Sequence, residues 1–279
     1  MKFPLISDEK INCLQHVLSI VEISALILSG IVVAFINTFA GGASVISISL
    51  FMVMGMSPFQ ANVINRVPVF FQTMASSYLF WKKGLLDIKR GLTIGIPVVM
   101  GCLVGANVSV VVNQKVFSIC LGLILLMMLF FIFYKPEAWL KGNEKLRQKK
   151  MDWKIFTVFL FTGFYAGFLH VGVGYFLLGG LVLLMGYDLL KGNAQKNFLV
   201  LLYSPFAIGF FIFNGDLTMK MAIYGLIHAI GNVIGATLAT HFGMKWGNNF
   251  IRWLMFVVII LTAMKLFGII DFSDLSELL

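Results

Sequence analysis

Two apolar stretches of this chain each carry a cation beside amide side chains at helical spacing. In "ANVINRVPVF", Asn62, Asn65 and Arg66 lie on two turns of one expected helix, with Asn62 three and four positions before the other two. In "GNAQKNFLVL", Asn193 and Lys196 are spaced in the same way. A charge inside a membrane is costly, so such a cation usually has an opposite charge beside it or marks a substrate pathway.

No acidic side chain is placed to pair with these two cations. Of the 12 Asp and Glu residues, only Glu22 lies within an apolar segment, near its start, and the others lie in loops, at helix ends or in the tails. We therefore predict that a bound anion supplies the missing negative charge. In the alternative interpretation, Arg66 extends to the membrane interface or bonds backbone carbonyls, Lys196 extends to the interface, and the amides only join helices.

Glycine-rich breaks, "AGGAS" and "VGVG", interrupt two of the apolar segments. A broken helix leaves backbone N–H groups unpaired, and a helix N-terminus attracts negative charge, although simple kinks are the alternative. His170, next to the second break, is a candidate for proton coupling, whereas a histidine in an apolar helix is more often a structural hydrogen-bonding group. The predicted substrate-binding residues are Gly41, Gly42, Ser44, Asn62, Asn65, Arg66, Gln72, Gly172, Gly174, Asn193, Lys196 and Tyr203.

The composition of the chain is that of a membrane protein. Of its 279 residues, 59% are hydrophobic and 12% are charged, whereas soluble domains carry about 25% charged residues. The net charge of +9 does not indicate nucleic-acid binding, because most charges lie in short loops between apolar segments, where they orient a protein in the bilayer. The sequence predicts an all-α polytopic membrane protein whose partners are the lipid bilayer and a small anionic substrate.

Neither the cysteines nor the N-terminus suggests a further function. Cys13, Cys102 and Cys120 lack metal-ligand spacing and are interpreted as inert packing residues. The first residues, "MKFPLISDEK", carry both signs of charge and no small-residue cleavage site, so no cleaved signal peptide is expected. Motifs of metalloproteases, serine hydrolases and ATP-binding loops are absent, so we expect no enzyme, no cofactor and no metal site.

The apolar segments form two repeats, residues 17–134 and 155–268, joined by a basic linker, residues 135–154. Segments are expected at about 17–39, 45–56, 58–81, 91–112, 116–134, 155–171, 175–186, 189–213, 219–240 and 249–268. The second and seventh of these runs are shorter than the roughly 20 residues that span a bilayer. Each is therefore expected to form a broken helix or a re-entrant hairpin with the segment before it. Each repeat then has this pair and three transmembrane helices, and the whole chain has 8–10 hydrophobic segments.

The two halves match each other at an offset of 131 residues, where Gly55 aligns with Gly186 and Asn62 aligns with Asn193. Each half holds five segments, an odd number, which predicts that the halves are inverted relative to each other. The basic loop "KKGLLDIKR" aligns with "NGDLTMK", which has one basic and one acidic residue, as opposite orientations require. On this reading the linker is cytoplasmic and both termini lie outside.

Three stretches carry a recognisable resemblance, and in the first of them a glycine-rich break is followed by G-x-x-P-x-x-A-N-x-x-N-R. They are "NTFAGGASVISISLFMVMGMSPFQANVINRV" (37–67), "GFYAGFLHVGVGYFLLGGLVLLMGYDLLKGNAQK" (163–196) and "FIRWLMFVVIILTAMKLFG" (250–268). Over about residues 20–268 the chain resembles the sulfite exporter TauE/SafE family, also called the toluene sulfonate uptake permease family. It departs from that family's pattern at Ala43, at "SIS" (47–49) and at His170. The resemblance implies a duplicated membrane transporter of sulfur-containing anions such as sulfite or sulfonates.

These features together predict a secondary transporter that exports a small sulfur-containing anion across the inner membrane by alternating access between two inverted repeats. An anion leaving a cell with a negative interior is driven outward by about 2.3 kcal/mol per charge per 100 mV, so export does not require a coupling ion. An anion channel and an ion-coupled importer of another small anion are the alternatives, and assembly into a homo-oligomer is left open.

Overall fold

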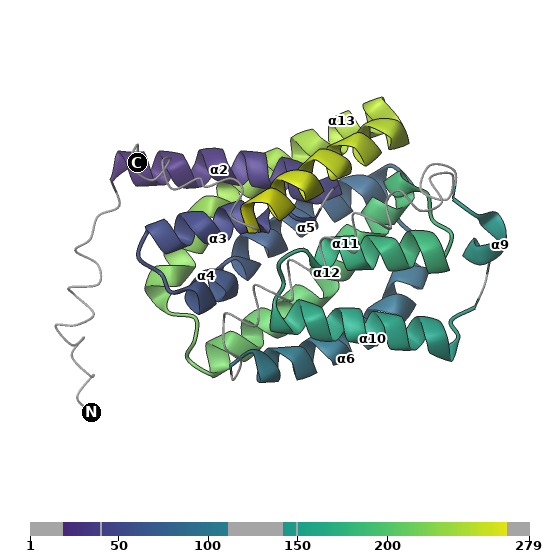
Figure 1. The fold of residues 1–279 in the computed structure, drawn as a ribbon, viewed down its shortest axis with the longest axis horizontal. Helices are drawn as coiled ribbons and strands as arrows, with labels where there is room; N and C mark the ends of the chain where they lie inside the picture. Colours follow the sequence, from purple (N-terminus) through teal and green to yellow (C-terminus); the bar gives the residue numbers. More distant parts are fainter. Residues whose placement is uncertain (1–18, 40, 111–141, 149, 267–279) are drawn as a thin grey trace.

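Every element in the described part of the chain is a helix. The computed structural model describes residues 19–39, 41–110, 142–148 and 150–266. Figure 1 shows its elements, which are α2 (Ile20–Phe39), α3 (Ser44–Val53), α4 (Pro58–Ile64), α5 (Arg66–Lys82), α6 (Ile88–Ser109), α9 (Glu144–Arg147), α10 (Trp153–Phe168), α11 (Val173–Gly179), the π-helix η1 (Gly180–Leu184), α12 (Leu189–Phe213) and α13 (Met219–Leu266). The predicted all-helical class is confirmed for these residues, and the segment expected at 116–134 lies outside them.

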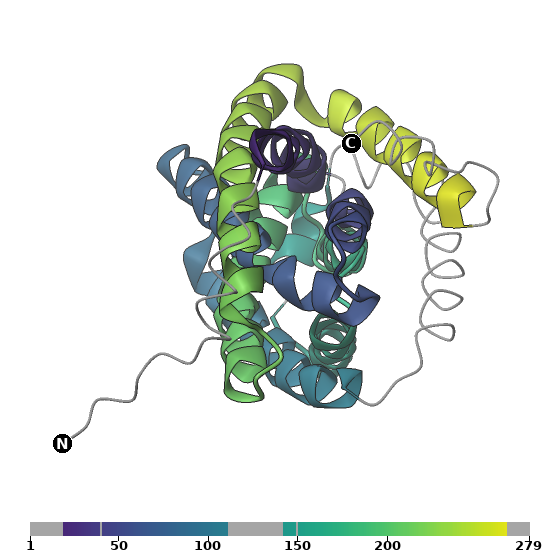
Figure 2. The ribbon, with the colours of Figure 1, turned by 90° about the vertical axis from the view of Figure 1, so that its left-hand side faces the viewer.

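Four of the described helices are long and apolar enough to cross a membrane: Ile20–Phe39, Ile88–Ser109, Leu189–Phe213 and Met219–Gly247. They lie close to four of the predicted segments. The chain turns at Gly247, where φ is 72°, and Figure 2 shows the remainder of α13 at an angle to the other helices. These helices support the polytopic membrane fold.

Side-chain caps determine where α4 and α12 begin. Ser57 Oγ accepts a hydrogen bond from Gln60 N at 3.2 Å, and Gln60 Oε1 accepts one from Ser57 N at 2.9 Å, which completes a capping box in front of Pro58. Asp188 Oδ1 accepts a hydrogen bond from Lys191 N at 3.0 Å at the start of α12. Asp188 thus starts the helix that carries Lys196, and Ser57 starts α4, which continues through Asn65 into α5 with Arg66.

The first glycine break turns the chain back on itself. His228 of α13 contacts both arms of the turn, because its Nδ1 lies 2.7 Å from Leu26 O in α2 and its Nε2 lies 2.8 Å from Ser47 Oγ in α3. If α3 continued straight on from α2, Ser47 would lie about 30 Å from Leu26 at 1.5 Å per residue. The two helices therefore form a re-entrant hairpin, and Figure 1 shows α3 returning beside α2.

The second break has the same effect on α10 and α11. In η1, Gly180 lies against the ring of Phe159 in α10, so that an added Cβ would be 3.1 Å from the ring. Farther from the break, Ile155 of α10 and Met185 share one apolar cluster. α11 and η1 therefore return alongside α10 as a second re-entrant hairpin.

Left-handed glycines recur at the predicted offset of 131 residues. In the first half Gly41, Gly55 and Gly84 have φ values of 74°, 86° and 69°, and in the second half Gly172, Gly186 and Gly215 have 73°, 72° and 77°. Only glycine adopts this conformation readily, so both halves turn at equivalent positions. The pattern supports the internal repeat, while the inversion of one half relative to the other stays a prediction.

Small residues let each hairpin pack closely against a helix of the other half. Gly101 and Gly105 of α6 face α10, Gly231 and Gly235 of α13 face α2, and a Cβ added at any of these four positions would collide with the facing backbone. Close backbone approach of this kind is how small residues stabilise helix pairs in membranes. Each hairpin is therefore held through its longer helix, α2 by α13 and α10 by α6.

Replacing Gly105 by alanine is expected to lower the melting temperature, because the Phe164 backbone opposite would have to move. Overpacking of a dense core costs about 1–3 kcal/mol. Gly209→Ala is the matched control, since no atom lies within 4 Å of its added Cβ and alanine is favoured over glycine in a helix by about 1 kcal/mol. Thermal unfolding of the detergent-purified Gly105→Ala and Gly209→Ala proteins measures both melting temperatures. Equal values for the two variants would contradict the close packing of Gly105 against α10.

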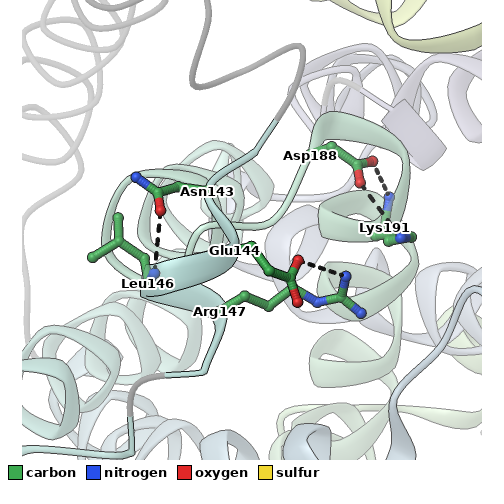
Figure 3. Close-up of polar contacts among 6 residues, drawn as sticks. All are labelled: Asn143, Glu144, Leu146, Arg147, Asp188 and Lys191. Atoms are coloured by element: carbon green, nitrogen blue, oxygen red, sulfur yellow. Dashed lines mark hydrogen bonds and ion pairs between the residues drawn. The ribbon is translucent and has the colours of Figure 1, made fainter.

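Part of the linker packs on the turn that ends the second hairpin. Asn143 Oδ1 caps α9 by accepting a hydrogen bond from Leu146 N, and Asn143 N donates to Gly186 O at 2.8 Å. Figure 3 shows α9, with the ion pair between Glu144 and Arg147 at 3.6 Å, beside the first turn of α12. The linker thereby contacts the second hairpin directly.

The loop before α6 lies at the same end of the molecule as this linker contact. Tyr187 lies between two guanidinium groups, with its ring centre 5.9 Å from Arg90 Cζ and 5.7 Å from Arg147 Cζ. Burial raises the pKa of the Tyr187 hydroxyl to about 12, so this ring is uncharged at neutral pH. Gln195 of α12 joins the same loop by paired hydrogen bonds to the backbone of Asp87, at 3.3 Å and 3.1 Å. Two basic segments of the chain therefore meet at one end.

Candidate functional site

The tips of the two hairpins touch each other through glycines. A Cβ added to Gly41 would lie 2.6 Å from Gly174 Cα, and one added to Gly174 would lie 2.7 Å from Gly41 Cα. Gly42, the next residue, packs against the ring of Tyr175. No side chain fits between the two backbones here, which explains why both breaks are rich in glycine.

The ammonium group of Lys196 holds the end of α2. Its Nζ donates hydrogen bonds to Asn37 O at 3.0 Å, to Thr38 O at 2.9 Å and to Asn193 Oδ1 at 2.8 Å. An ammonium group has three donors, so all of them are used here. The positive charge also balances the partial negative charge at the C-terminus of a helix. Lys196, from the second half, therefore fixes the tip of the first hairpin.

Arg66 makes the equivalent contact with the end of α10. Its Nη1 donates to Ala166 O at 3.0 Å and its Nη2 donates to Gly167 O at 2.6 Å. The guanidinium carbon lies 4.9 Å from the ring centre of Phe211, and the side chain is 0% exposed. Each hairpin tip is thus capped by a cation from the other half. The alternative interpretation of the sequence was that Arg66 bonds backbone carbonyl groups, and the structure shows such bonds. Anion binding by Arg66 stays a prediction.

A small cavity lies between the hairpin tips and the helices α5 and α12. Its volume is about 30 Å³. A water needs roughly 10–15 Å³, so the cavity has room for about two waters. Six of the residues predicted from the sequence line it: Gly41, Ser44, Gln72, His170, Gly174 and Lys196. We call this space the central cavity.

Gln72 is a cavity-lining residue with an unpaired polar atom. It is 2% exposed, and its Oε1 has no hydrogen-bond partner among the described residues. Buried polar atoms are paired in the great majority of cases, so each exception calls for a ligand or a water. By contrast Ser44 Oγ accepts a hydrogen bond from Asn37 Nδ2 at 3.0 Å and keeps its own proton to donate.

The other predicted residues surround the central cavity without lining it. Asn193 accepts the hydrogen bond from Lys196, and the Tyr203 hydroxyl contacts His170. The residues of the predicted set that lie outside the cavity lining are Gly42, Asn62, Asn65, Arg66, Gly172, Asn193 and Tyr203.

Three polar residues of the lining were not predicted. Asn37, Thr73 and Asn197 all line the central cavity. Asn197 Nδ2 donates to Thr38 O at 3.1 Å, so it supports the same helix end as Lys196. The signal for Asn197 was present, because it aligns with Arg66 at the offset of 131. Thr73 Oγ1 donates within its own helix to Val69 O at 2.9 Å, and no sequence pattern marked it.

His170 combines an unusual backbone with a place in the cavity wall. Its φ is 55°, the one positive value among described residues other than glycine, and its Nδ1 lies 3.1 Å from the Tyr203 hydroxyl. The tautomer decides which of the two groups donates the proton. A ring that faces the cavity and bonds a phenol is placed as a proton-coupling residue would be, and that role stays a prediction.

Both charged side chains in the described interior are cations. The described acidic residues occupy other places, such as the first turn of α2 for Glu22 and the helix caps for Asp87, Asp152 and Asp188. In the part of the chain covered by the structure, no group of three His, Cys, Asp or Glu side chains could hold a metal ion. The local charge around the central cavity is therefore positive.

Comparison with known proteins matches the family model described as sulfite exporter TauE/SafE to residues 26–266. Relatives include a probable membrane transporter protein, ORF9, of Sinorhizobium, which is 26% identical over 86% of this chain and 90% of its own length. A probable membrane transporter protein of Haemophilus influenzae is 24% identical over 85% and 91%, and YfcA of Escherichia coli, a probable membrane transporter protein, is 24% identical over 83% and 84%. No solved structure matches the chain significantly.

Proposed function

Because the chain belongs to the sulfite exporter TauE/SafE family, we propose that it is a secondary transporter that exports a small sulfur-containing anion, such as sulfite or an organosulfonate, across the cell inner membrane. The relatives described above are named as probable membrane transporters. One observation carries the anion proposal: the central cavity lies where two glycine tips meet and has a buried lysine, but no described carboxylate, in its wall.

Within this proposal the lining residues have separate tasks. Lys196 supplies positive charge, and because its donors are used by the protein it acts mainly through that charge. Gln72 and Ser44 supply hydrogen bonds that orient the anion. Gly41 and Gly174 let the two backbones approach so closely that the anion contacts both hairpins at once.

Alternating access fits the small size of the central cavity. Room for about two waters corresponds to a closed state, whereas an open anion channel needs a continuous water path. We infer that the repeats 17–134 and 155–268 move against each other around the touching tips, as in transporters built from inverted repeats.

The orientation proposed for the chain places the linker 135–154 in the cytoplasm and both termini outside. Arg90, in the first turn of α6, and Arg147 of the linker lie at the same end, where both contact the ring of Tyr187. Basic residues concentrate in cytoplasmic loops, so the shared location of two basic segments supports this orientation.

The first test is thermal stabilisation of the purified protein by a panel of anions: sulfite, sulfate, thiosulfate, taurine, sulfoacetate and chloride. A ligand that binds only the folded state raises the free energy of unfolding by about 2.7 kcal/mol at a hundredfold excess over Kd. A rise in melting temperature with one or more sulfur anions, but not with chloride, is expected. No rise with any member of the panel would contradict an anion substrate.

Gln72→Leu is expected to reduce the stabilisation by the best anion while leaving the unliganded protein folded. A hydrogen bond to a charged group contributes about 1.5–3 kcal/mol, so the loss in affinity should be about tenfold or more. Because Gln72 Oε1 has no partner in the described protein, the leucine removes no internal bond from that atom. Unchanged affinity in Gln72→Leu would move the anion away from the central cavity.

A further inference from the structure

Four buried polar atoms on one short stretch have no partner in the described part of the chain. They are Asn62 Oδ1, Asn65 Nδ2, Asn65 Oδ1 and Arg66 Nε. Asn65 and Arg66 are both 0% exposed, and Asn62 is 5% exposed. Leaving one such atom unpaired costs about 1–3 kcal/mol, so a cluster of them is expected to hold something in the working protein.

Asn62 lies about one helical turn before both Asn65 and Arg66, so its side chain is a neighbour of each of them. Asn65 joins α4 to α5 with φ −59° and ψ −18°, so the chain stays helical through it. Residues three and four positions apart on a helix share one face. Arg66 fixes that face toward the end of α10, where it bonds Ala166 O and Gly167 O. Arg66 therefore places its end of the cluster at the second hairpin, and none of the three residues lines the central cavity.

The equivalent positions in the second half show what is unusual about this cluster. Asn62 and Asn65 align with Asn193 and Lys196 at the offset of 131. There Asn193 donates to Leu189 O at 2.8 Å and accepts from Lys196 Nζ at 2.8 Å. The second half thus satisfies its polar atoms internally, whereas the first half leaves both ends of the Asn65 amide unpaired.

We propose that Asn62, Asn65 and Arg66 form a second station for the transported oxyanion, separate from the central cavity and beside the end of α10. This inference rests on the proposed transport function. The anion pauses at the two stations in turn, once between the hairpin tips and once beside Arg66.

The unpaired atoms define the chemical class of the occupant. Asn65 Nδ2 and Arg66 Nε are donors beside a full positive charge, which suits the oxygen atoms of an anion. The amide oxygens of Asn62 and Asn65 are acceptors, and they suit a ligand that also carries a proton. A singly protonated oxyanion such as hydrogen sulfite offers both groups.

The test compares sulfite binding with sulfite transport in two leucine variants. Binding is measured by thermal stabilisation of purified protein, and transport by uptake of radiolabelled sulfite into proteoliposomes. For Asn65→Leu we expect affinity within about twofold of the wild type but transport reduced about tenfold or more, because one charge-assisted hydrogen bond is lost on the path. For Gln72→Leu we expect affinity itself to fall about tenfold or more, as argued above for the central cavity.

Asn65→Asp provides an isosteric variant that tests the station from the other direction. A fixed carboxylate beside Arg66 should occupy the place of the anion, so the unliganded protein should melt at a higher temperature while sulfite transport is lost. If water alone fills the cluster, neither Asn65 variant should slow transport, and the second station is overturned. Equal losses of binding and transport in Asn65→Leu would also overturn it, because they indicate one shared site.

Binding and transport by the wild-type protein show whether the proposed transport function or only the second station has failed. If the wild type neither binds nor transports any anion of the panel, the proposed function fails and the second station fails with it. If the wild type binds and transports sulfite and Asn65→Leu behaves identically, only the second station fails.

Discussion

Lys196→Met is expected to weaken anion binding by about a hundredfold or more, because breaking one buried charge pair costs about 3–5 kcal/mol. The side chain lines the central cavity and is 2% exposed, so its charge acts there with little screening by water. Transport of sulfite into proteoliposomes should fall to the background of empty vesicles.

The same substitution is expected to destabilise the protein in the absence of ligand. Without the ammonium group, Asn193 Oδ1 loses its bond from Nζ. Asn37 O keeps only the bond from Gly41 N, and Thr38 O keeps only the bond from Asn197. Each buried polar group left unpaired costs about 1–3 kcal/mol. A lower melting temperature without ligand, together with a smaller shift on adding sulfite, is the expected signature of both roles.

Two variants separate charge from fold in this experiment. Lys196→Arg keeps the charge and should retain part of the anion-induced shift. Lys191→Met removes a lysine at the start of the same helix, where its Nζ lies 4.0 Å from Asp188 Oδ2, and this variant should bind the anion like the wild type. If Lys196→Met inserts, folds and transports normally, the anion site is not where the central cavity lies.

Much of the helical frame could be predicted because it depends on local chemistry. Ser57 with Gln60, and Asp188 with Lys191, are caps made within four residues, so the sequence alone shows them. The glycine breaks were also visible, although the sequence left open whether the short runs span or return. That choice depends on contacts such as His228 with Ser47, which are 181 residues apart.

The partners of the two cations could not be predicted in the same way. Arg66 bonds carbonyl groups about 100 residues away in the chain, and Lys196 bonds carbonyl groups about 159 residues away. Every residue has a carbonyl group, so no residue type marks the ones at a helix end that will lie free. The sequence showed that no carboxylate pairs with the cations, but not that helix ends take part of that role.

The composition of the central cavity was predictable only in part for a related reason. Gly41, Gly174 and Lys196 stand out in apolar surroundings, so the sequence marks them as candidates, and all three line one cavity. Asn37 and Thr73 are ordinary in a helix, and their exposure to the cavity follows from how the hairpins cross. The offset of 131 carries information here too, because Val69 and Val200 align and both line the cavity.

Gly41→Ala is expected to be among the most damaging small substitutions in the chain, because two separate penalties combine. A φ of 74° is unfavourable for alanine by about 1–2 kcal/mol, and the added Cβ would lie 2.6 Å from Gly174 Cα. Since that atom belongs to the backbone, the hairpin tips must separate, at a further cost of about 1–3 kcal/mol. Both the melting temperature and sulfite transport should fall sharply.

Two other glycines isolate the two penalties. Gly84→Ala has φ 69° but no atom within 4 Å of the new Cβ, so it carries the backbone strain alone and should lower stability without changing affinity for the anion. Gly174→Ala has an ordinary φ but a Cβ 2.7 Å from Gly41 Cα, so it carries the collision alone. If contact between the tips is what transport requires, Gly174→Ala loses transport although its backbone is unstrained, and Gly84→Ala keeps it. Transport that follows melting temperature across all three variants would instead show that the tips serve only stability.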